Sequence, residues 1–154
     1  MSILVLKVLS MPKSSWMHWM SENTFSSPIR VYVEDTDAGG IVFYANYLKF
    51  MERARTEFFR SLGFNKPALF DGLQFVVREL DIVYHQPAVL DDIIEVTAEP
   101  IKLSRVSVEI AQQVFREGSL LVAGRVKVAC IGAESKRPKA IPAEIHSALK
   151  NYLR

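Results

Sequence analysis

Residues 46–62 read NYLKFMERARTEFFRSL and decide the fold class, because their apolar side chains recur at helical spacing. The apolar positions are Tyr47, Leu48, Phe50, Met51, Ala54, Phe58, Phe59 and Leu62. Charged residues fill the positions between them, so the stretch predicts one amphipathic helix of about four turns. Gly63 follows as a predicted stop. A helix with so many aromatic side chains must be buried, so we expect a sheet wrapped around it.

Five segments around this helix carry the β-branched residues or the alternation that are typical of strands. They are residues 29–34, 74–85, 93–103, 106–115 and 120–131. The last three are joined by short turns, which favour antiparallel neighbours because a parallel pair needs a long crossover. Residues 142–153 predict one more amphipathic helix. The order predicts an α+β domain with a mostly antiparallel five-stranded sheet around one long central helix.

A chain of 154 residues is long enough for one compact domain with a sizeable core. We expect residues 25–154 to form this domain, and residues 1–24 to be a loosely ordered extension or a misassigned start. The apolar residues 3–6 are too few for a membrane span of roughly 20 residues, and Lys7 interrupts them, which is unlike a signal peptide. No integral membrane segment is therefore predicted. A net charge of +2 gives no support for nucleic-acid binding.

Cys130 is the only cysteine, so an intrachain disulfide is impossible and a reducing, cytoplasmic compartment is the simpler expectation. It stands in an alternating apolar run, residues 126–131, where a small buried thiol packs like an alanine. We interpret it as a packing residue rather than a catalytic one.

The predicted sheet also leaves an unpaired edge strand, and pairing such edges across a two-fold axis would protect them. Self-association is therefore expected.

Residues 34–47 read EDTDAGGIVFYANY, an acidic cluster and a glycine pair that lead directly into the predicted helix. Asp37 is the candidate reacting carboxylate, because it is the last acid before the glycines and is expected to lie closest to the helix start. The other interpretation is a turn, in which aspartate hydrogen-bonds its own backbone. Glu34 and Asp35 are interpreted as supporting or solvent-facing groups.

The residues after Asp37 are candidate substrate contacts. Gly39 and Gly40 suit a tight turn or the close approach of a ligand, and the two roles are compatible. Ile41 and Val42 follow them and are included among the contacts. Tyr44 either donates its backbone N–H to a developing oxyanion or packs its ring. Because the first N–H groups of a helix lack internal partners, the junction places a carboxylate beside an anion-stabilising pole, which suits attack on a carbonyl.

Residues 136–139, KRPK, form the densest basic run and by default a solvated loop. If the substrate carries a nucleotide phosphate, Lys136, Arg137, Lys102 and Arg105 are natural contacts, because charge-assisted bonds to phosphate are strong. No histidine pair has metal-ligand spacing, so no metal is predicted. The sequence also lacks a Gly-x-Ser-x-Gly elbow, a P-loop and a dinucleotide fingerprint. No cofactor is therefore expected.

The run 35–44 (DTDAGGIVFY), followed by Asn46-Tyr47 and by residues 52–57 (ERARTE), resembles the 4-hydroxybenzoyl-CoA thioesterase family of hotdog-fold proteins. It looks most like the Tol-Pal-associated acyl-CoA thioesterase branch. The resemblance extends from about Ile29 to Ile131 and includes residues 87–92 (PAVLDD). It implies a sheet wrapped around the long helix, dimers or tetramers, and hydrolysis of an acyl-CoA thioester without a metal or redox cofactor.

The resemblance also implies roles for two residues. In that family the aspartate matching Asp37 acts on the thioester carbonyl, as nucleophile or as general base for water, and the backbone N–H matching Tyr44 polarises the carbonyl oxygen. Related Tol-Pal-associated members often carry histidine at the position of Tyr44, so any role of that imidazole is absent here. The 4-hydroxybenzoyl-CoA enzymes carry tyrosine there, so the departure does not exclude activity.

The leading hypothesis is a cytoplasmic acyl-CoA thioesterase that acts as a homodimer or homotetramer. The alternative is a non-catalytic hotdog protein that binds acyl-CoA or acyl carrier protein in lipid-synthesis or envelope complexes. A dehydratase of the same fold is expected to need a histidine near the helix start, and none occurs between Glu34 and Arg60. The sequence leaves the acyl group and its donor, CoA or carrier protein, open.

Overall fold

The computed structural model describes residues 24–64, 69–70 and 72–153. The predicted extension, residues 1–24, lies outside this part apart from Thr24. The elements in chain order are β1 (Phe25–Arg30), the 3-10 turn η1 (Val33–Asp35), α3 (Asn46–Ser61), β2 (Leu69–Phe70), β3 (Leu73–Tyr84), β4 (Ile93–Leu103), β5 (Ser107–Arg116), β6 (Ser119–Gly132) and α4 (Ala143–Lys150). The α+β class and the order of elements are as predicted.

The strands form one sheet in the order β1-β4-β5-β6-β3-β2, and every pairing is antiparallel. Strands β3, β4, β5 and β6 are the four long strands that the sequence predicts, β1 is a shorter edge strand, and β2 adds a pair of residues at the other edge. Because β2 pairs only with Leu73 and Gln74, the rest of β3 has no neighbouring strand on that side among the described residues. The remainder of β3 is therefore an open sheet edge.

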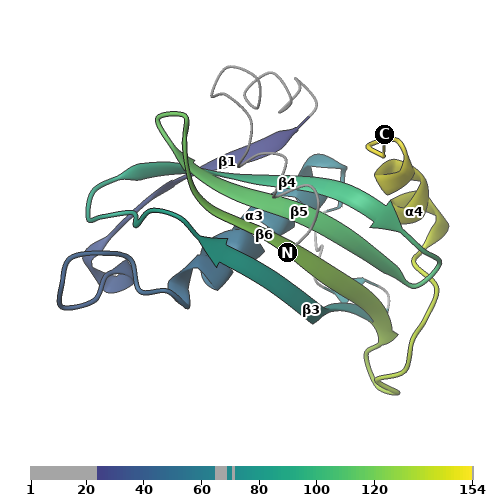
Figure 1. Cartoon of the computed structure of the whole chain (residues 1–154). Coiled ribbons are helices and arrows are strands. Elements are labelled where there is room, and N and C mark those ends of the chain that lie inside the picture. The colour runs from purple at the N-terminus through teal and green to yellow at the C-terminus, as the bar shows by residue number, and fades with distance from the viewer. Residues whose placement is uncertain (1–23, 65–68, 71, 154) are drawn as a thin grey trace.

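Helix α3 lies against one face of the curved sheet and packs on β1 and β4, while α4 lies at one end of the strands (Figure 1). Most apolar side chains of α3 are buried, and Phe50, Ala54 and Phe58 completely so, whereas Leu48 is exposed. The sheet contributes Ile94, Val96, Val108, Ile110, Val114, Val122 and Val126 to the same core. The helix ends where predicted, with Gly63 adopting a positive φ of 100° just beyond it. This is the hotdog arrangement that the resemblance implies.

Two features bring α3 close to the sheet. Gly124 of β6 leaves room for the helix, because a Cβ there would lie 3.0 Å from Met51 Cε. The buried side chain of Gln112 in β5 donates to the Met51 carbonyl over 2.9 Å and accepts a hydrogen bond from Arg55 over 3.0 Å. Burial lowers the pKa of Arg55 below its ordinary value. One polar bridge thus fixes the helix within an otherwise apolar interface.

The predicted first strand, residues 29–34, is wrong in its position. Strand β1 covers Phe25–Arg30, and Val33–Asp35 form a 3-10 turn. Pro28, which was expected to begin the strand, lies within it, since an edge strand tolerates a residue without an N–H group. The strand ends because the N–H of Tyr32 bonds the side chain of Asp35 instead of a neighbouring strand. A side-chain bond therefore outweighs the strand propensity of Tyr32 and Val33.

Candidate active site

The connection between β1 and α3 is folded around the buried carboxylate of Asp35, which is 6% exposed. Its Oδ2 accepts from the N–H of Tyr32 over 2.9 Å, and its Oδ1 accepts from the side chain of Asn46 over 2.9 Å. Its backbone carbonyl accepts from the N–H of Phe43 over 3.0 Å. The carboxylate joined to the first residue of α3 is therefore Asp35 and not Asp37, which corrects the expectation that Asp37 lies closest to the helix. Asp35 has the supporting role.

Asp37 stands in an exposed tight turn that its own side chain closes. Its Oδ1 accepts from the N–H of Gly39 over 2.8 Å, and its carbonyl accepts from the N–H of Gly40 over 3.1 Å. Gly40 adopts a φ of 80°, which favours glycine. The second oxygen, Oδ2, makes no hydrogen bond within the described residues. The turn interpretation of Asp37 is therefore confirmed, whereas its role as the reacting carboxylate stays a prediction.

Tyr44 lies in a turn two residues before α3, which begins at Asn46. Its backbone N–H bonds no residue of the described ranges, whereas its carbonyl accepts from the hydroxyl of Tyr84 over 2.8 Å. Tyr44 is 66% exposed, so it is not a core residue. The backbone N–H is thus available as a donor, and the carbonyl of the same peptide group, that of Phe43, accepts from the N–H of Asn46 over 2.8 Å.

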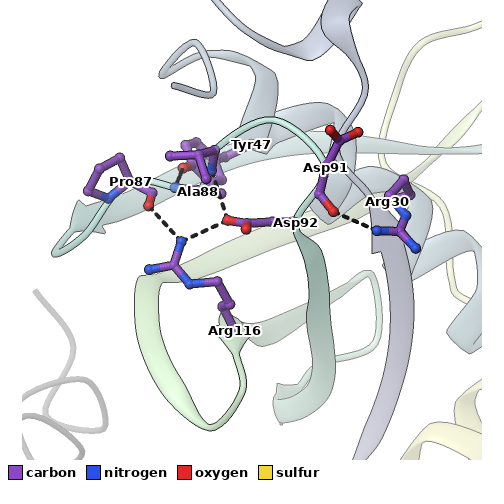
Figure 2. A network of polar contacts seen from close by, with 8 residues as sticks. Arg30, Tyr47, Pro87, Ala88, Asp91, Asp92 and Arg116 are labelled. Carbon is purple, nitrogen blue, oxygen red and sulfur yellow. Dashed lines mark hydrogen bonds and ion pairs between the residues drawn. The ribbon is translucent and has the colours of Figure 1, made fainter. Parts of the chain in front are cut away.

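The connection between β3 and β4, residues 85–92, forms the opposite wall and pairs with the Asp37 turn. The N–H of Val42 donates to the carbonyl of Ala88 over 2.9 Å, and the N–H of Leu90 donates to the carbonyl of Gly40 over 3.3 Å. The hydroxyl of Tyr47, in the first turn of α3, also accepts from the N–H of Ala88 over 3.0 Å, as Figure 2 shows. The Asp37 turn and residues 85–92 therefore form one connected unit above the start of α3.

Between these segments lies a cavity of about 560 Å³. Its lining residues are Asp37, Ile41, Val42, Phe43, Tyr44, Tyr47, Tyr84, His85, Gln86 and Pro87. The structure thus brings together four of the predicted site residues, Asp37, Ile41, Val42 and Tyr44. Gly39 and Gly40 shape the adjacent turn without lining the cavity. Asp37 and Tyr44, whose N–H has no partner among the described residues, thus line the same cavity with several aromatic side chains, which suits a reaction at a carbonyl.

Burial favours the neutral form of two phenols that line this cavity, Tyr47 and Tyr84. Burial raises the pKa of the Tyr47 hydroxyl above its ordinary value, although the hydrogen bond from the Ala88 N–H and the positive charge of Arg116 act in the opposite direction. Burial also raises the pKa of Tyr84, with smaller effects from Tyr47 and Tyr44. Neutral phenols keep their hydroxyl hydrogens at neutral pH, so Tyr84 can serve as a permanent donor to the Tyr44 carbonyl.

The four predicted basic contacts do not line this cavity. Lys102 borders a separate hollow of about 320 Å³ together with Arg78 and Lys127. Arg105 lies beside α4 in another hollow, and Lys136 donates to the side chain of Gln74 over 2.8 Å. Arg137 lies in the same loop as Lys136, after β6. The structure therefore does not bring these four residues to the cavity that Asp37 lines.

Sequence reasoning missed three residues that shape the site. Tyr47 was assigned only to the helix core, and its spacing gave no signal for its bond to Ala88. Tyr84 was predicted only as a residue near the end of the strand 74–85. The following Gln86-Pro87 marked the turn of the chain but gave no sign of the bond from Tyr84 to the Tyr44 carbonyl. Arg116 carried no motif, and its bonds to residues 85–92 depend on pairing that the sequence does not reveal.

The comparisons with known proteins agree with this arrangement. The family model of the thioesterase superfamily matches residues 39–123. "Acyl-CoA thioesterase YbgC" of Haemophilus influenzae is 43% identical over 131 residues, which cover 84% of this chain and 96% of that protein. "Acyl-CoA thioester hydrolase YbgC" of Escherichia coli O6:H1 is 39% identical over 133 residues, which cover 85% of this chain and 99% of that protein.

A solved structure with the same fold is also a probable thioesterase. The crystal structure of a probable thioesterase from Bartonella henselae superposes with a TM-score of 0.73 and 35% identity, and the match covers 77% of this chain and 99% of the other. The matched region begins at Gly39, in the Asp37 turn, and it includes every residue that lines the cavity except Asp37. The chain belongs to the thioesterase superfamily. None of the helices that the structure describes is long and apolar enough to cross a membrane.

Proposed function

We propose that this hydrolase of the thioesterase superfamily cleaves an acyl-CoA thioester at the cavity that holds Asp37 and Tyr44. The observation that carries the proposal is the pairing of a carboxylate oxygen without a hydrogen bond and a backbone N–H without one, among the described residues, in one chamber. The names of the relatives in Haemophilus influenzae and Escherichia coli support acyl-CoA as the substrate class.

The reaction can follow one of two routes from Asp37. Its carboxylate attacks the thioester carbonyl carbon to give an anhydride that water then hydrolyses, or it takes a proton from a water that attacks directly. In both routes the C–S bond breaks, one water is consumed, and the products are a free carboxylic acid and the CoA thiol. The N–H of Tyr44 supports the step by donating to the oxygen on which negative charge develops.

The acyl group fits the aromatic part of the cavity. A volume of about 560 Å³ is in the usual range for small-molecule sites, and Phe43, Tyr47 and Tyr84 give it apolar surfaces. Lys102, Arg78 and Lys127 border their own hollow, which supports a nucleotide-phosphate site away from the acyl chamber. Contacts from Arg105, Lys136 and Arg137 to CoA stay predictions, as do association with a Tol-Pal system and a carrier-protein donor.

A homodimer is part of the proposal. Strand β3 leaves its outer edge open among the described residues, and the exposed side chains of Val77, Leu80 and Tyr84 lie along it. Exposed apolar edge strands invite pairing with another strand, and a two-fold axis would satisfy both edges. Because Tyr84 also lines the cavity, a partner strand on β3 would lie beside the site.

The free, buried thiol of Cys130 supports a reducing compartment such as the cytoplasm.

Substitution of Asp37 tests the assignment. Asp37→Asn and Asp37→Ala are expected to lower kcat by at least about a hundredfold on a panel of acyl-CoAs, because general acid–base groups contribute this much or more. Glu34→Gln is the matched control, since Glu34 is an exposed carboxylate three residues away that does not line the cavity. Full turnover in both Asp37 variants would refute the role of Asp37.

The rival function is non-catalytic binding of acyl-CoA or acyl carrier protein. It shares the cavity but needs no reacting carboxylate, so the same panel separates the two. A folded wild-type protein that binds CoA or a carrier protein and hydrolyses no thioester on the panel would favour the rival. Measured turnover that depends on Asp37 would favour the thioesterase.

A further inference from the structure

Arg116, the last residue of β5, reaches across to the loop of residues 85–92 (Figure 2). Its NH1 donates to Asp92 Oδ2 over 2.7 Å and to the carbonyl of Pro87 over 3.2 Å. The two charged side chains are 29% and 16% exposed, so water screens this pair less than a fully exposed one. One guanidinium nitrogen therefore holds both ends of the loop.

The loop is also closed from within. The Oδ2 atom that binds Arg116 accepts in addition from the N–H of Val89 over 2.8 Å. Next to it, Asp91 adopts a φ of 71°, a left-handed conformation that is costly for a residue with a side chain. Its carbonyl accepts from Arg30 over 2.6 Å, and its N–H donates to the carbonyl of Val31 over 3.0 Å. Loop 85–92 is thus held in one conformation by bonds from three sides.

The same loop supports the reacting segment. Ala88 accepts from Val42, and Leu90 donates to the carbonyl of Gly40, which is part of the Asp37 turn. Pro87, whose carbonyl binds Arg116, lines the cavity itself. A displacement of the loop would therefore move the carboxylate of Asp37 and one wall of the chamber together.

We propose that Arg116, acting through Asp92 and Pro87, is a positioning residue for Asp37. It does not touch the cavity, and its effect passes through the loop to the turn that carries the carboxylate. The role rests on the proposed function of Asp37. Misplacing a reacting group by about 1 Å can cost on the order of a hundredfold in rate, so a clamp of this kind has a measurable effect.

The test compares Arg116→Ala and Arg116→Lys with Arg125→Ala as the matched control. Arg125 also makes two ion pairs on the same sheet, to Asp81 over 2.6 Å and to Glu109 over 3.1 Å, and within the described part of the chain neither its ion pairs nor its side-chain hydrogen bonds involve the loop. Arg116→Ala is expected to lower kcat by about 10- to 100-fold with a smaller change in KM. Arg116→Lys should recover part of the loss, and Arg125→Ala should stay within about twofold of wild type.

Two further readouts separate positioning from a purely structural effect. Amide hydrogen exchange at Ala88 and Val89 should become faster in Arg116→Ala, because their N–H groups belong to the clamped loop. In an Asp37→Asn background, Arg116→Ala should cause no further loss of the residual turnover, because the two residues act through the same carboxylate. Each prediction applies to a folded protein, which far-ultraviolet circular dichroism verifies.

Several outcomes would overturn the inference. Faster exchange with unchanged kcat would show a loop clamp that does not position Asp37, and unchanged exchange would refute the clamp itself. An equal loss of activity in Arg125→Ala would mean that any lost ion pair has this effect. If Asp37→Asn were fully active while Arg116→Ala lost activity, the proposed role of Asp37 would fail and the positioning of Asp37 with it, whereas the exchange result would still stand for the loop.

Discussion

The side-chain amide of Asn46 donates to the carboxylate of Asp35 over 2.9 Å, and both residues are only 6% exposed. Asn46 is the first residue of α3, and Asp35 ends the 3-10 turn that follows β1. This single bond fixes the spacing between the turn and the helix, and the ten residues between them carry Asp37 and Tyr44. The geometry of the candidate site therefore depends on a residue that does not line its cavity.

Removing this carboxylate should destabilise the protein. Asp35→Ala leaves the Asn46 amide and the Tyr32 N–H without their acceptor, and an unpaired buried polar group costs about 1–3 kcal/mol. We expect the free energy of unfolding to fall by this amount in urea titrations. Glu34→Ala, at the exposed neighbouring position, should change it by no more than about 0.5 kcal/mol. Equal effects from the two substitutions would contradict the assigned role.

The hydrogen bond from Tyr84 to the Tyr44 carbonyl predicts an effect on catalysis rather than on affinity. Tyr84→Phe keeps the ring that packs on Tyr47 at 5.6 Å between centroids and removes only the hydroxyl. If that bond holds in place the turn that carries the Tyr44 N–H, kcat should fall about tenfold, equivalent to the free energy of one hydrogen bond, while KM changes little.

Tyr32→Phe is the control for this substitution, because Tyr32 is 61% exposed and does not line the cavity. It removes a tyrosine hydroxyl outside the cavity and should leave kcat and KM at wild-type values. The role of Tyr84 would be refuted by a Tyr84→Phe variant with wild-type kcat, or by one whose whole loss lies in KM.

Most of the fold could be predicted because periodicity reports which face of an element is buried. The spacing of Phe50, Ala54 and Phe58 placed α3 to within one residue of its observed ends, and alternation located the four long strands after it. The first strand failed because its end is set by a side-chain bond from Asp35, which local propensity does not register. Periodicity describes packing and says nothing of such bonds.

The site was predictable only where its residues are contiguous in sequence. Asp37, Ile41, Val42 and Tyr44 lie in one motif, and the structure places all four at the same cavity. The other wall comes from residues about 40 positions further on, and Arg116 comes from still further along the chain. Their approach depends on strand pairing and register, which composition and spacing do not determine. Residues 87–92 matched a family motif, but the sequence did not show that this loop bonds Arg116 and the Asp37 turn.

Cys130 should be chemically protected in the native protein. Its side chain is completely buried, as predicted for a packing residue, and burial raises the pKa of the thiol above its ordinary value. At pH 8 a thiol-reactive disulfide reagent should modify the unfolded protein rapidly and the native protein only as fast as it opens. Rapid native labelling would contradict the burial of this residue.

The same thiol has a consequence for stability at alkaline pH. Because the folded pKa is raised, the folded state binds the proton more tightly than the unfolded chain. The stabilisation that comes from this difference in pKa is fully present below the thiol pKa of the unfolded chain, and it is lost as pH rises through the pKa of the folded protein. Cys130→Ala should therefore lose less stability than wild type between pH 8 and pH 10, measured as the change in unfolding free energy. A steeper decline in the variant would contradict the sign.

Gly124 predicts how closely α3 and the sheet must approach. A Cβ at this position would lie 2.9 Å from the Asp81 carbonyl of the paired strand and 3.0 Å from Met51 Cε of α3. The methionine end can move, but the carbonyl belongs to the backbone of β3, so Gly124→Ala should cost about 1–3 kcal/mol of unfolding free energy through strain. Adding Met51→Ala should not restore stability, since the backbone contact remains and a buried side chain is lost. A Gly124→Ala protein within about 0.5 kcal/mol of wild type would show that the strands can separate there, and that the close approach is not required for the fold.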